Sequence, residues 1–188
     1  VMARTGPDGG LWVVDMYRYM IEHPQWLPQQ GKDELRPWYR AGDDRGRIYR
    51  VVRRDRPERK VPRLADFSDA ELIATLESSN GWQRDTAQRL LVRGNLQSGD
   101  AQNSIAALEE LTTTSQNPLA RVHALWTLAG LGQLSDTTLE AALNDDQPGV
   151  RRNAVQLAAE ITVDLDRLTP LTEDPDVKVR LELACTLG

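Results

Sequence analysis

Apolar side chains recur at helical spacing through residues 65–188. Four segments of this part carry an arginine at the same place in the pattern, with small or aliphatic residues three and seven positions later. The arginines are Arg84, Arg121, Arg151 and Arg180; three positions later stand Ala87, Ala124, Ala154 and Leu183, and seven positions later Leu91, Leu128, Ala158 and Leu187. Because positions three and seven apart share one face of an α-helix, the pattern predicts four helices that each bury one face.

The spacing of these arginines leaves room for a second helix in each unit. Successive arginines are 37, 30 and 29 residues apart, which suits a helix, a short turn and another helix. Ser68 and Ser135 stand where they would cap the first helix of a unit. We predict these first helices over residues 69–77, 101–111, 137–143 and 165–171. Since one pair cannot hide its own apolar face, we expect about four pairs to stack around a continuous core.

Residues 1–55 follow a different pattern. The turn sequence Pro7-Asp8-Gly9-Gly10 leads into "LWVVD" at 11–15, whose β-branched and aromatic residues favour a strand. A second run, "GRIYRVV" at 46–52, alternates like a strand, and we expect the residues between the two runs to be mostly irregular. Two strands alone are marginal in water, so we predict a remnant of a larger sheet and a chain that is a fragment.

Composition divides the chain in the same region. All four Tyr residues and three of the five Trp residues precede residue 51. The segment 36–63 holds eleven basic and four acidic residues, a balance of +7 that the overall net charge of −5 hides. Pro57 and Pro62 within it disfavour helix and strand pairing. We therefore predict one domain at 1–55 and another at 65–188, joined by a basic linker at 56–64.

Composition also excludes two classes of structure. No apolar run approaches the roughly 20 residues of a membrane-spanning helix, so we expect no span in this chain. The single cysteine, Cys185, excludes an internal disulfide framework and a cysteine-rich metal site. Because Cys185 lies among Leu181, Leu183 and Leu187, we expect a buried thiol.

Two motifs carry a family resemblance over residues 4–54. "GPDGGLWVVDMYRYMIEHPQW" at 6–26 and "DRGRIYRVV" at 44–52 resemble the end of the propeller in bacterial membrane-bound dehydrogenases, relatives of the glucose and sorbosone dehydrogenase propellers. In that family the motifs form strands of the final blade, and a helical repeat domain follows, often with a c-type cytochrome domain. The resemblance implies a periplasmic or cell-envelope parent that oxidises a sugar or alcohol with pyrroloquinoline quinone and calcium. It transfers no cofactor ligand to this chain, so we expect no cofactor in the fragment.

The second part resembles HEAT repeats over residues 65–188. The resemblance rests on "NPLARVHALWTLAGLG" at 117–132, "QPGVRRNAVQLAAEI" at 147–161 and "DPDVKVRLELACTLG" at 174–188. It implies a mostly α fold, an α–α superhelix (solenoid), preceded by the small β remnant of a final propeller blade. The implied function is a non-catalytic scaffold that docks a protein partner or a neighbouring domain such as the cytochrome domain. A free-standing binding module, with the front strands as an accessory cap, is the alternative. The last unit lacks a capping helix, so we expect the natural chain to continue.

The insertion "MYRYMIEHPQWLP" at 16–28 holds the candidate pocket residues. Its aromatic and titratable side chains are suited to stacking on a sugar ring and exchanging a proton, so the insertion is an alternative active-site wall of the parent enzyme. These residues are Tyr17, Tyr19, Glu22, His23 and Trp26. The competing structural interpretation is that the aromatics cover a propeller edge and His23 forms a hydrogen bond within its loop.

Acidic residues near the insertion allow two interpretations as well. Asp15, Asp43 and Asp44 could ligate a metal, but "AGDDRGR" is more simply a turn whose carboxylates pair with Arg45 and Arg47. The two histidines of the sequence have no metal-ligand spacing. A nucleophile with its base, a glycine-rich phosphate loop and a heme attachment motif are all lacking, so we assign no catalytic residue and no metal.

Two sets of arginines complete the candidates. Four form a basic patch that we expect to bridge the β part to the acidic repeats: Arg50, Arg53, Arg54 and Arg56. We expect the repeat arginines to bond carbonyls or carboxylates of neighbouring turns, such as those of Asp145, Asp146, Asp174 or Asp176. Residues 64–188 hold 19 acidic and 9 basic residues, so they would repel a phosphate backbone and we expect no nucleic-acid partner.

Overall fold

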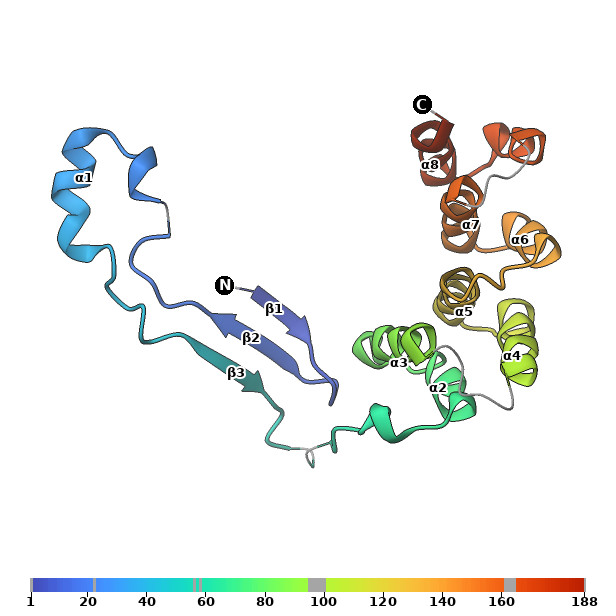
Figure 1. The fold of residues 1–188 in the computed structure, drawn as a ribbon, viewed down its shortest axis with the longest axis horizontal. Helices are drawn as coiled ribbons and strands as arrows, with labels where there is room; N and C mark the ends of the chain where they lie inside the picture. Colours follow the sequence, from blue (N-terminus) through green and yellow to red (C-terminus); the bar gives the residue numbers. More distant parts are fainter. Residues whose placement is uncertain are drawn as a thin grey trace. The chain divides into compact units, whose positions relative to one another are not determined.

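A computed structural model describes residues 2–21, 23–55, 57, 59–94, 101–160 and 165–187. It divides the chain into two compact units, Val1–Pro62 and Arg63–Gly188. The described part is mostly helical, with eight α-helices and a small three-stranded antiparallel sheet (Figure 1). The division falls inside the predicted linker at 56–64.

The sheet of the first unit contains β1 (Met2–Thr5), β2 (Leu11–Asp15) and β3 (Arg47–Val51). Its order is β1-β2-β3, with β2 antiparallel to both neighbours. The two predicted strands are confirmed. The structure adds β1, which four residues with mixed character could not reveal by alternation.

Both faces of this sheet carry exposed apolar side chains. The register places Met2, Val14 and Ile48 side by side on one face, and all three are exposed. On the other face, Leu11 lies opposite Val51, and both are about half exposed. A sheet normally buries at least one face against a core, so these side chains are unusual for a free sheet in water.

The segment between β2 and β3 is more regular than expected. It contains α1 (Gln29–Leu35) between two short 3₁₀ helices, Pro24–Trp26 and Arg36–Trp38. The prediction of a mostly irregular segment is therefore wrong for α1. Two i,i+4 hydrogen bonds support this helix, because the side-chain amides of Gln29 and Gln30 donate to the carboxylates of Asp33 and Glu34.

The second unit consists of successive helix pairs. Its helices are α2 (Asp69–Thr75), α3 (Gly81–Gly94), α4 (Ala101–Thr114), α5 (Pro118–Gly130), α6 (Asp136–Leu143), α7 (Pro148–Glu160) and α8 (Val177–Leu187). Within this unit, α2, α4 and α6 form one row and α3, α5, α7 and α8 the other, with neighbours in contact along each row (Figure 1). The predicted first helices at 69–77, 101–111 and 137–143 are confirmed within a few residues.

The caps and the apolar columns agree with the pattern. The Ser68 hydroxyl accepts from the Glu71 amide in a reciprocal capping box, and the Ser135 hydroxyl accepts from the Thr138 amide. All four side chains in the column three positions after the arginines are buried. In the column seven positions after, three are buried and Leu187 is half exposed.

The fourth helix pair differs from the prediction in its first helix. The expected helix at 165–171 is wrong, because the structure has two 3₁₀ helices there, Leu165–Arg167 and Thr169–Glu173. Pro170 explains the difference, since a proline inside an α-helix removes an amide donor and its ring clashes with the preceding turn.

The expected burial of Cys185 is also wrong. The buried side chains of α8 are Val179 and Leu183, four positions apart, whereas Cys185 is exposed. Two residues beyond Leu183 is roughly 200° around a helix, so Cys185 lies on the opposite face. In the described part of the chain, no helix combines the length and the apolar character needed to cross a membrane.

Candidate functional site

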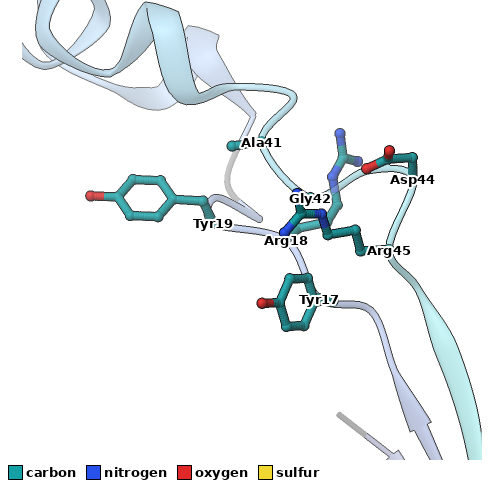
Figure 2. Close-up of a pocket in the computed structure, with 7 residues that line it drawn as sticks. All are labelled: Tyr17, Arg18, Tyr19, Ala41, Gly42, Asp44 and Arg45. Carbon is teal, nitrogen blue, oxygen red and sulfur yellow. The ribbon is translucent and has the colours of Figure 1, made fainter.

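Two of the five candidate pocket residues line a pocket in the first unit. Tyr17 and Tyr19 stand on the segment that follows β2, with Arg18 between them (Figure 2). The loop before β3 supplies the other wall through Gly42, Asp44 and Arg45. The pocket holds about 480 Å³ and is open to solvent.

The two walls are held together through their backbones. The Tyr19 amide donates to the Ala41 carbonyl at 3.1 Å. Gly42 has φ +82°, and a Cβ there would lie 2.1 Å from the carbonyl oxygen of Tyr17, so only glycine fits. Tyr17 itself has φ +46°, a conformation that non-glycine residues seldom adopt, and its amide donates to the Asp15 carboxylate at 3.1 Å.

Each tyrosine ring also has a fixed neighbour. The guanidinium carbon of Arg47 lies 4.7 Å from the centroid of the Tyr17 ring, a cation–π contact. The Tyr19 ring lies 5.8 Å from the Trp38 ring at an interplanar angle of 44°. Tyr17 is nevertheless 46% exposed and Tyr19 67% exposed, so ring surface remains accessible to a ligand.

His23 and Trp26, the other described candidates of the insertion, do not line the pocket. The His23 Nδ1 accepts from the Gln25 amide at 3.3 Å, a hydrogen bond within its own loop. Trp26 is 83% exposed and is not among the lining residues. Glu22 lies outside the described residues. The pocket lining therefore has no histidine, and of the described candidates it brings together only Tyr17 and Tyr19.

The acidic turn pairs differently from the prediction. The Asp43 carboxylate accepts from Arg40 at 2.7 Å, three residues earlier, and not from Arg45 or Arg47. This hydrogen bond lowers the pKa of Asp43. Among the residues that the structure describes, no three His, Cys, Asp or Glu side chains are grouped so as to hold a metal ion.

Arg50 of the basic patch holds a turn to the sheet. Its Nε donates to the Asp8 carboxylate at 2.6 Å, while the Trp12 indole and the Gly10 amide donate at 3.0 and 3.1 Å. The Trp12 hydrogen bond outweighs the opposing effect of burial and, with those from Arg50 and Gly10, lowers the pKa of Asp8 to about 2. Asp8 thus ties the turn before β2 to β3.

The other described arginines of the patch are Arg53 and Arg54. Arg53 pairs with the neighbouring carboxylate of Asp55. Arg54 is exposed in the turn after β3, and Arg56 lies outside the described residues. That this segment bridges the two units stays a prediction.

The four repeat arginines make the same hydrogen bond, each within its own helix pair of the second unit. Each Nη1 donates to the backbone carbonyl six residues earlier, in the turn between the two helices of a pair. The pairs are Arg84 with Ser78, Arg121 with Ser115, Arg151 with Asp145, and Arg180 with Asp174. A guanidinium therefore closes each of these turns.

Two of the arginines also donate hydrogen bonds to the inter-helix turn of the next helix pair. Arg121 donates to the carboxylates of Asp145 and Asp146 at 2.7 and 2.9 Å. Arg151 donates through two nitrogens to the buried carboxylate of Asp174 at 2.7 and 2.8 Å. The Arg151 hydrogen bonds are the main cause of the lowered pKa of Asp174. Each link joins one inter-helix turn to the following one.

The second helices form a groove that the sequence did not reveal. It holds about 540 Å³. Its floor consists of the half-buried apolar residues Val92 of α3 and Trp126 and Ala129 of α5, and the exposed Gly130 also lines it. Charged residues line its rim, namely Asp85, Arg89 and Arg93 of α3 and Glu160 of α7. The Trp126 indole donates to Asn153 of α7 at 2.9 Å, which fixes the ring at the floor.

His123 stands beside this groove on α5. Its Nδ1 lies 2.6 Å from the amide oxygen of Gln88, and its Nε2 lies 3.8 Å from Asp85. Burial lowers the pKa of His123, and the positive charge of Arg84 lowers it further, against an opposing effect of Asp85. His123 therefore takes up a proton less readily than an exposed imidazole does.

A signal for the groove was present in the sequence. Asp85, Arg89 and Arg93 recur every four residues and must share a face of α3. Trp126 and Gly130 have the same spacing on α5. That these two faces meet depends on the packing of α3 against α5, which a periodic pattern alone does not specify.

The comparison with known families concerns the first unit. A sequence profile described as a domain of unknown function, DUF7133, matches residues 1–55, which span the three strands and the segment between β2 and β3. No curated protein and no solved structure matches the chain. The family description assigns no activity to the matched residues.

Proposed function

We propose that this chain is a non-catalytic part of a larger dehydrogenase-like protein, and that its helical unit is a HEAT-like solenoid that docks a protein partner or a neighbouring domain. The turn-closing bond of Arg84, Arg121, Arg151 and Arg180 supports the repeat assignment, because one contact recurs at a constant six-residue offset. The stacked rows of helices support it too, since a solenoid buries each unit against its neighbours.

The observation that carries the docking function is the groove on α3, α5 and α7. Binding surfaces are enriched in tryptophan and arginine, and energy concentrates in anchors that fill a central pocket. The groove offers this combination, with Trp126 on the floor and Arg89 and Arg93 on one rim. The Arg121–Asp145 and Arg151–Asp174 links favour a rigid surface, which lowers the entropy cost of binding.

The sheet supports the propeller part of this proposal. In a propeller each blade packs face to face on its neighbours, so apolar residues on both faces of β1 to β3 would be buried there. Adjacent blades of the same protein are the occupants that we propose for both faces. The parent would oxidise a sugar or alcohol with pyrroloquinoline quinone and calcium, in the periplasm or cell envelope, and a cytochrome domain is the proposed docking partner.

A second candidate is that residues 17–28 line the active site of the parent. Tyr17 and Tyr19 favour it, because both line a pocket. His23 argues against proton transfer at that pocket, since it bonds within its loop and is not part of the lining. The geometry therefore favours binding over catalysis.

The docking function is tested by selecting binders from a displayed peptide library against the full chain. We expect the selected peptides to lose affinity for Arg89→Glu and Arg93→Glu, which reverse the charge of the groove rim. Arg167→Glu is the matched control, because it changes an arginine that pairs only loosely with Asp136, at 3.5 Å. Peptides that bind all variants equally would refute the groove as the docking surface.

The non-catalytic assignment has its own assay. The chain, supplied with pyrroloquinoline quinone, calcium and an artificial electron acceptor, should not oxidise glucose or other sugars. Measurable turnover that depends on the chain would contradict the assignment, whatever the peptide selection gives.

A further inference from the structure

The Tyr17 pocket is lined by the guanidinium groups of Arg18 and Arg45, and the positive charge of Arg18 helps to lower the pKa of Asp43. Among the described residues, no carboxylate or carbonyl accepts a hydrogen bond from the side chain of Arg18 or Arg45. Arg40 and Arg50 of the same unit, in contrast, each hold a carboxylate at 2.7 Å or less. Arg18 and Arg45 therefore keep hydrogen-bond donors available for a ligand at the pocket wall. A guanidinium group is suited to binding a carboxylate through two parallel hydrogen bonds.

The aromatic wall supplies a second kind of contact. Tyr17 and Tyr19 expose ring surface at the pocket, and Arg47 and Trp38 hold the two rings from outside the lining. A ring fixed in this way loses little entropy when a flat ligand stacks on it. The lining also holds one carboxylate, Asp44, which can accept a hydrogen bond from a hydroxyl group.

Several contacts hold the backbone of the pocket in an unfavourable conformation. The left-handed conformation of Tyr17 is unfavourable, and it persists because Asp15 accepts from its amide while Gly42 allows the opposite wall to approach. Strained residues of this kind concentrate at ligand sites, where the surrounding structure holds them in place. The strain places Tyr17 at the wall of the pocket rather than in the line of β2.

We propose that this pocket binds a small ligand that bears a carboxylate on a six-membered ring. Arg18 and Arg45 bind the carboxylate, and the ring lies against Tyr17 or Tyr19. Two sources supply this chemistry, an acidic sugar of the hexuronate type and an aromatic acid. The site is independent of the docking function proposed for the helical unit, and it involves no reaction.

Calorimetric titration of the full chain tests the proposal with sodium glucuronate and sodium benzoate as probes. We expect saturable binding of at least one probe, and the stronger of the two identifies the source. Glucose and benzyl alcohol, which lack the carboxylate, should bind at least about tenfold more weakly, because an ionic hydrogen-bonded pair contributes at least one factor of ten.

Variants separate the pocket from the rest of the surface. Arg18→Gln and Arg45→Gln should each weaken binding about tenfold, and Tyr19→Leu should weaken it while leaving the fold intact, because Tyr19 is largely exposed. Arg54→Gln, an exposed arginine outside the lining, should leave binding unchanged. Circular dichroism of each variant checks that the sheet and helices are retained.

Three results would overturn the proposal. The first is that neither probe binds saturably. The second is that Arg18→Gln and Arg45→Gln bind as tightly as the unaltered chain. The third is that sodium sulfate binds as tightly as the ring carboxylates, which would mean that the arginines attract any anion and that the aromatic wall adds nothing.

Discussion

Arg151 holds the buried carboxylate of Asp174 through two parallel hydrogen bonds of 2.7 and 2.8 Å. The same guanidinium donates to the Asp145 carbonyl, so one side chain fastens two consecutive inter-helix turns. The first of these turns precedes α7 and the second precedes α8, so this link helps to fix the position of α8 against α7.

Removing this carboxylate should weaken the helical unit. Asp174→Ala leaves the Arg151 guanidinium largely buried without its partner, and we expect a loss of about 2–4 kcal/mol in the free energy of unfolding. The neighbouring Glu173→Ala removes an exposed carboxylate and should change it by less than about 0.5 kcal/mol. Denaturation in urea measures both. Equal effects of the two substitutions would mean that the link is not stabilising.

His123 should make the helical unit less stable in mild acid. Its folded pKa lies below the ordinary value of 6.5, so the unfolded chain binds the proton more readily. Stability is therefore full above pH 6.5 and declines as the pH falls below that value. His123→Gln, which still offers a donor to Gln88, should flatten this decline. The test is to measure the melting temperatures of the unaltered chain and of His123→Gln from about pH 8 to about pH 5.5. An equal decline in both proteins would mean that His123 does not cause the loss of stability.

Asp8 should stabilise the first unit down to strongly acidic pH. Its folded pKa of about 2 lies below the usual 3.8, so its contribution is complete above about pH 4 and is lost as the pH falls toward 2. Asp8→Asn removes the charge that Arg50 binds and should cost about 1–3 kcal/mol. The indole N–H signal of Trp12 in NMR spectra reports the loss. Asp55→Asn, an exposed control, should leave that signal unchanged.

Gly42 should tolerate no side chain. Gly42→Ala brings a Cβ to 2.1 Å from the Tyr17 carbonyl oxygen at φ +82°, so the pocket walls must separate and stability should fall by more than about 1 kcal/mol. The control is Gly149→Ala in the first turn of α7, where a Cβ meets nothing within 4 Å. Alanine there should be neutral or slightly stabilising. The hydrogen-exchange rate of the Tyr19 amide reports whether the two pocket walls stay together, because this amide donates to the Ala41 carbonyl. Exchange as slow in Gly42→Ala as in the control would contradict the prediction.

The helical unit was predictable where each residue's role is local. The period of Ala87 and Leu91 after Arg84 defines a buried face, and Ser68 followed by Glu71 marks a helix start. Residues 165–171 differ from the predicted helix because their apolar residues have helical spacing, whereas Pro170 cannot continue an α-helix. Cys185 is exposed because only Leu183 of its three neighbouring leucines is buried, and Cys185 lies on the opposite face of α8 from Leu183.

The candidate site was predictable only in part. The aromatic insertion drew attention to Tyr17 and Tyr19, but Gly42 and Arg45 come from a loop more than twenty residues later. Only the pairing of β2 with β3 brings those two segments together. Likewise, the partner of Arg50 is Asp8, 42 residues away, and no charge pattern in the basic stretch indicates it.

The order of the sheet has one practical consequence. Within the described residues, β1 and β3 each pair with β2 only, so neither outer border of the sheet has a further strand paired to it. Such borders recruit strands from other molecules, above all when isoleucine and methionine are uncovered beside them. A preparation of this chain should therefore self-associate through intermolecular β-bridges as its concentration rises, and a lysine in place of Ile48 should suppress that aggregation.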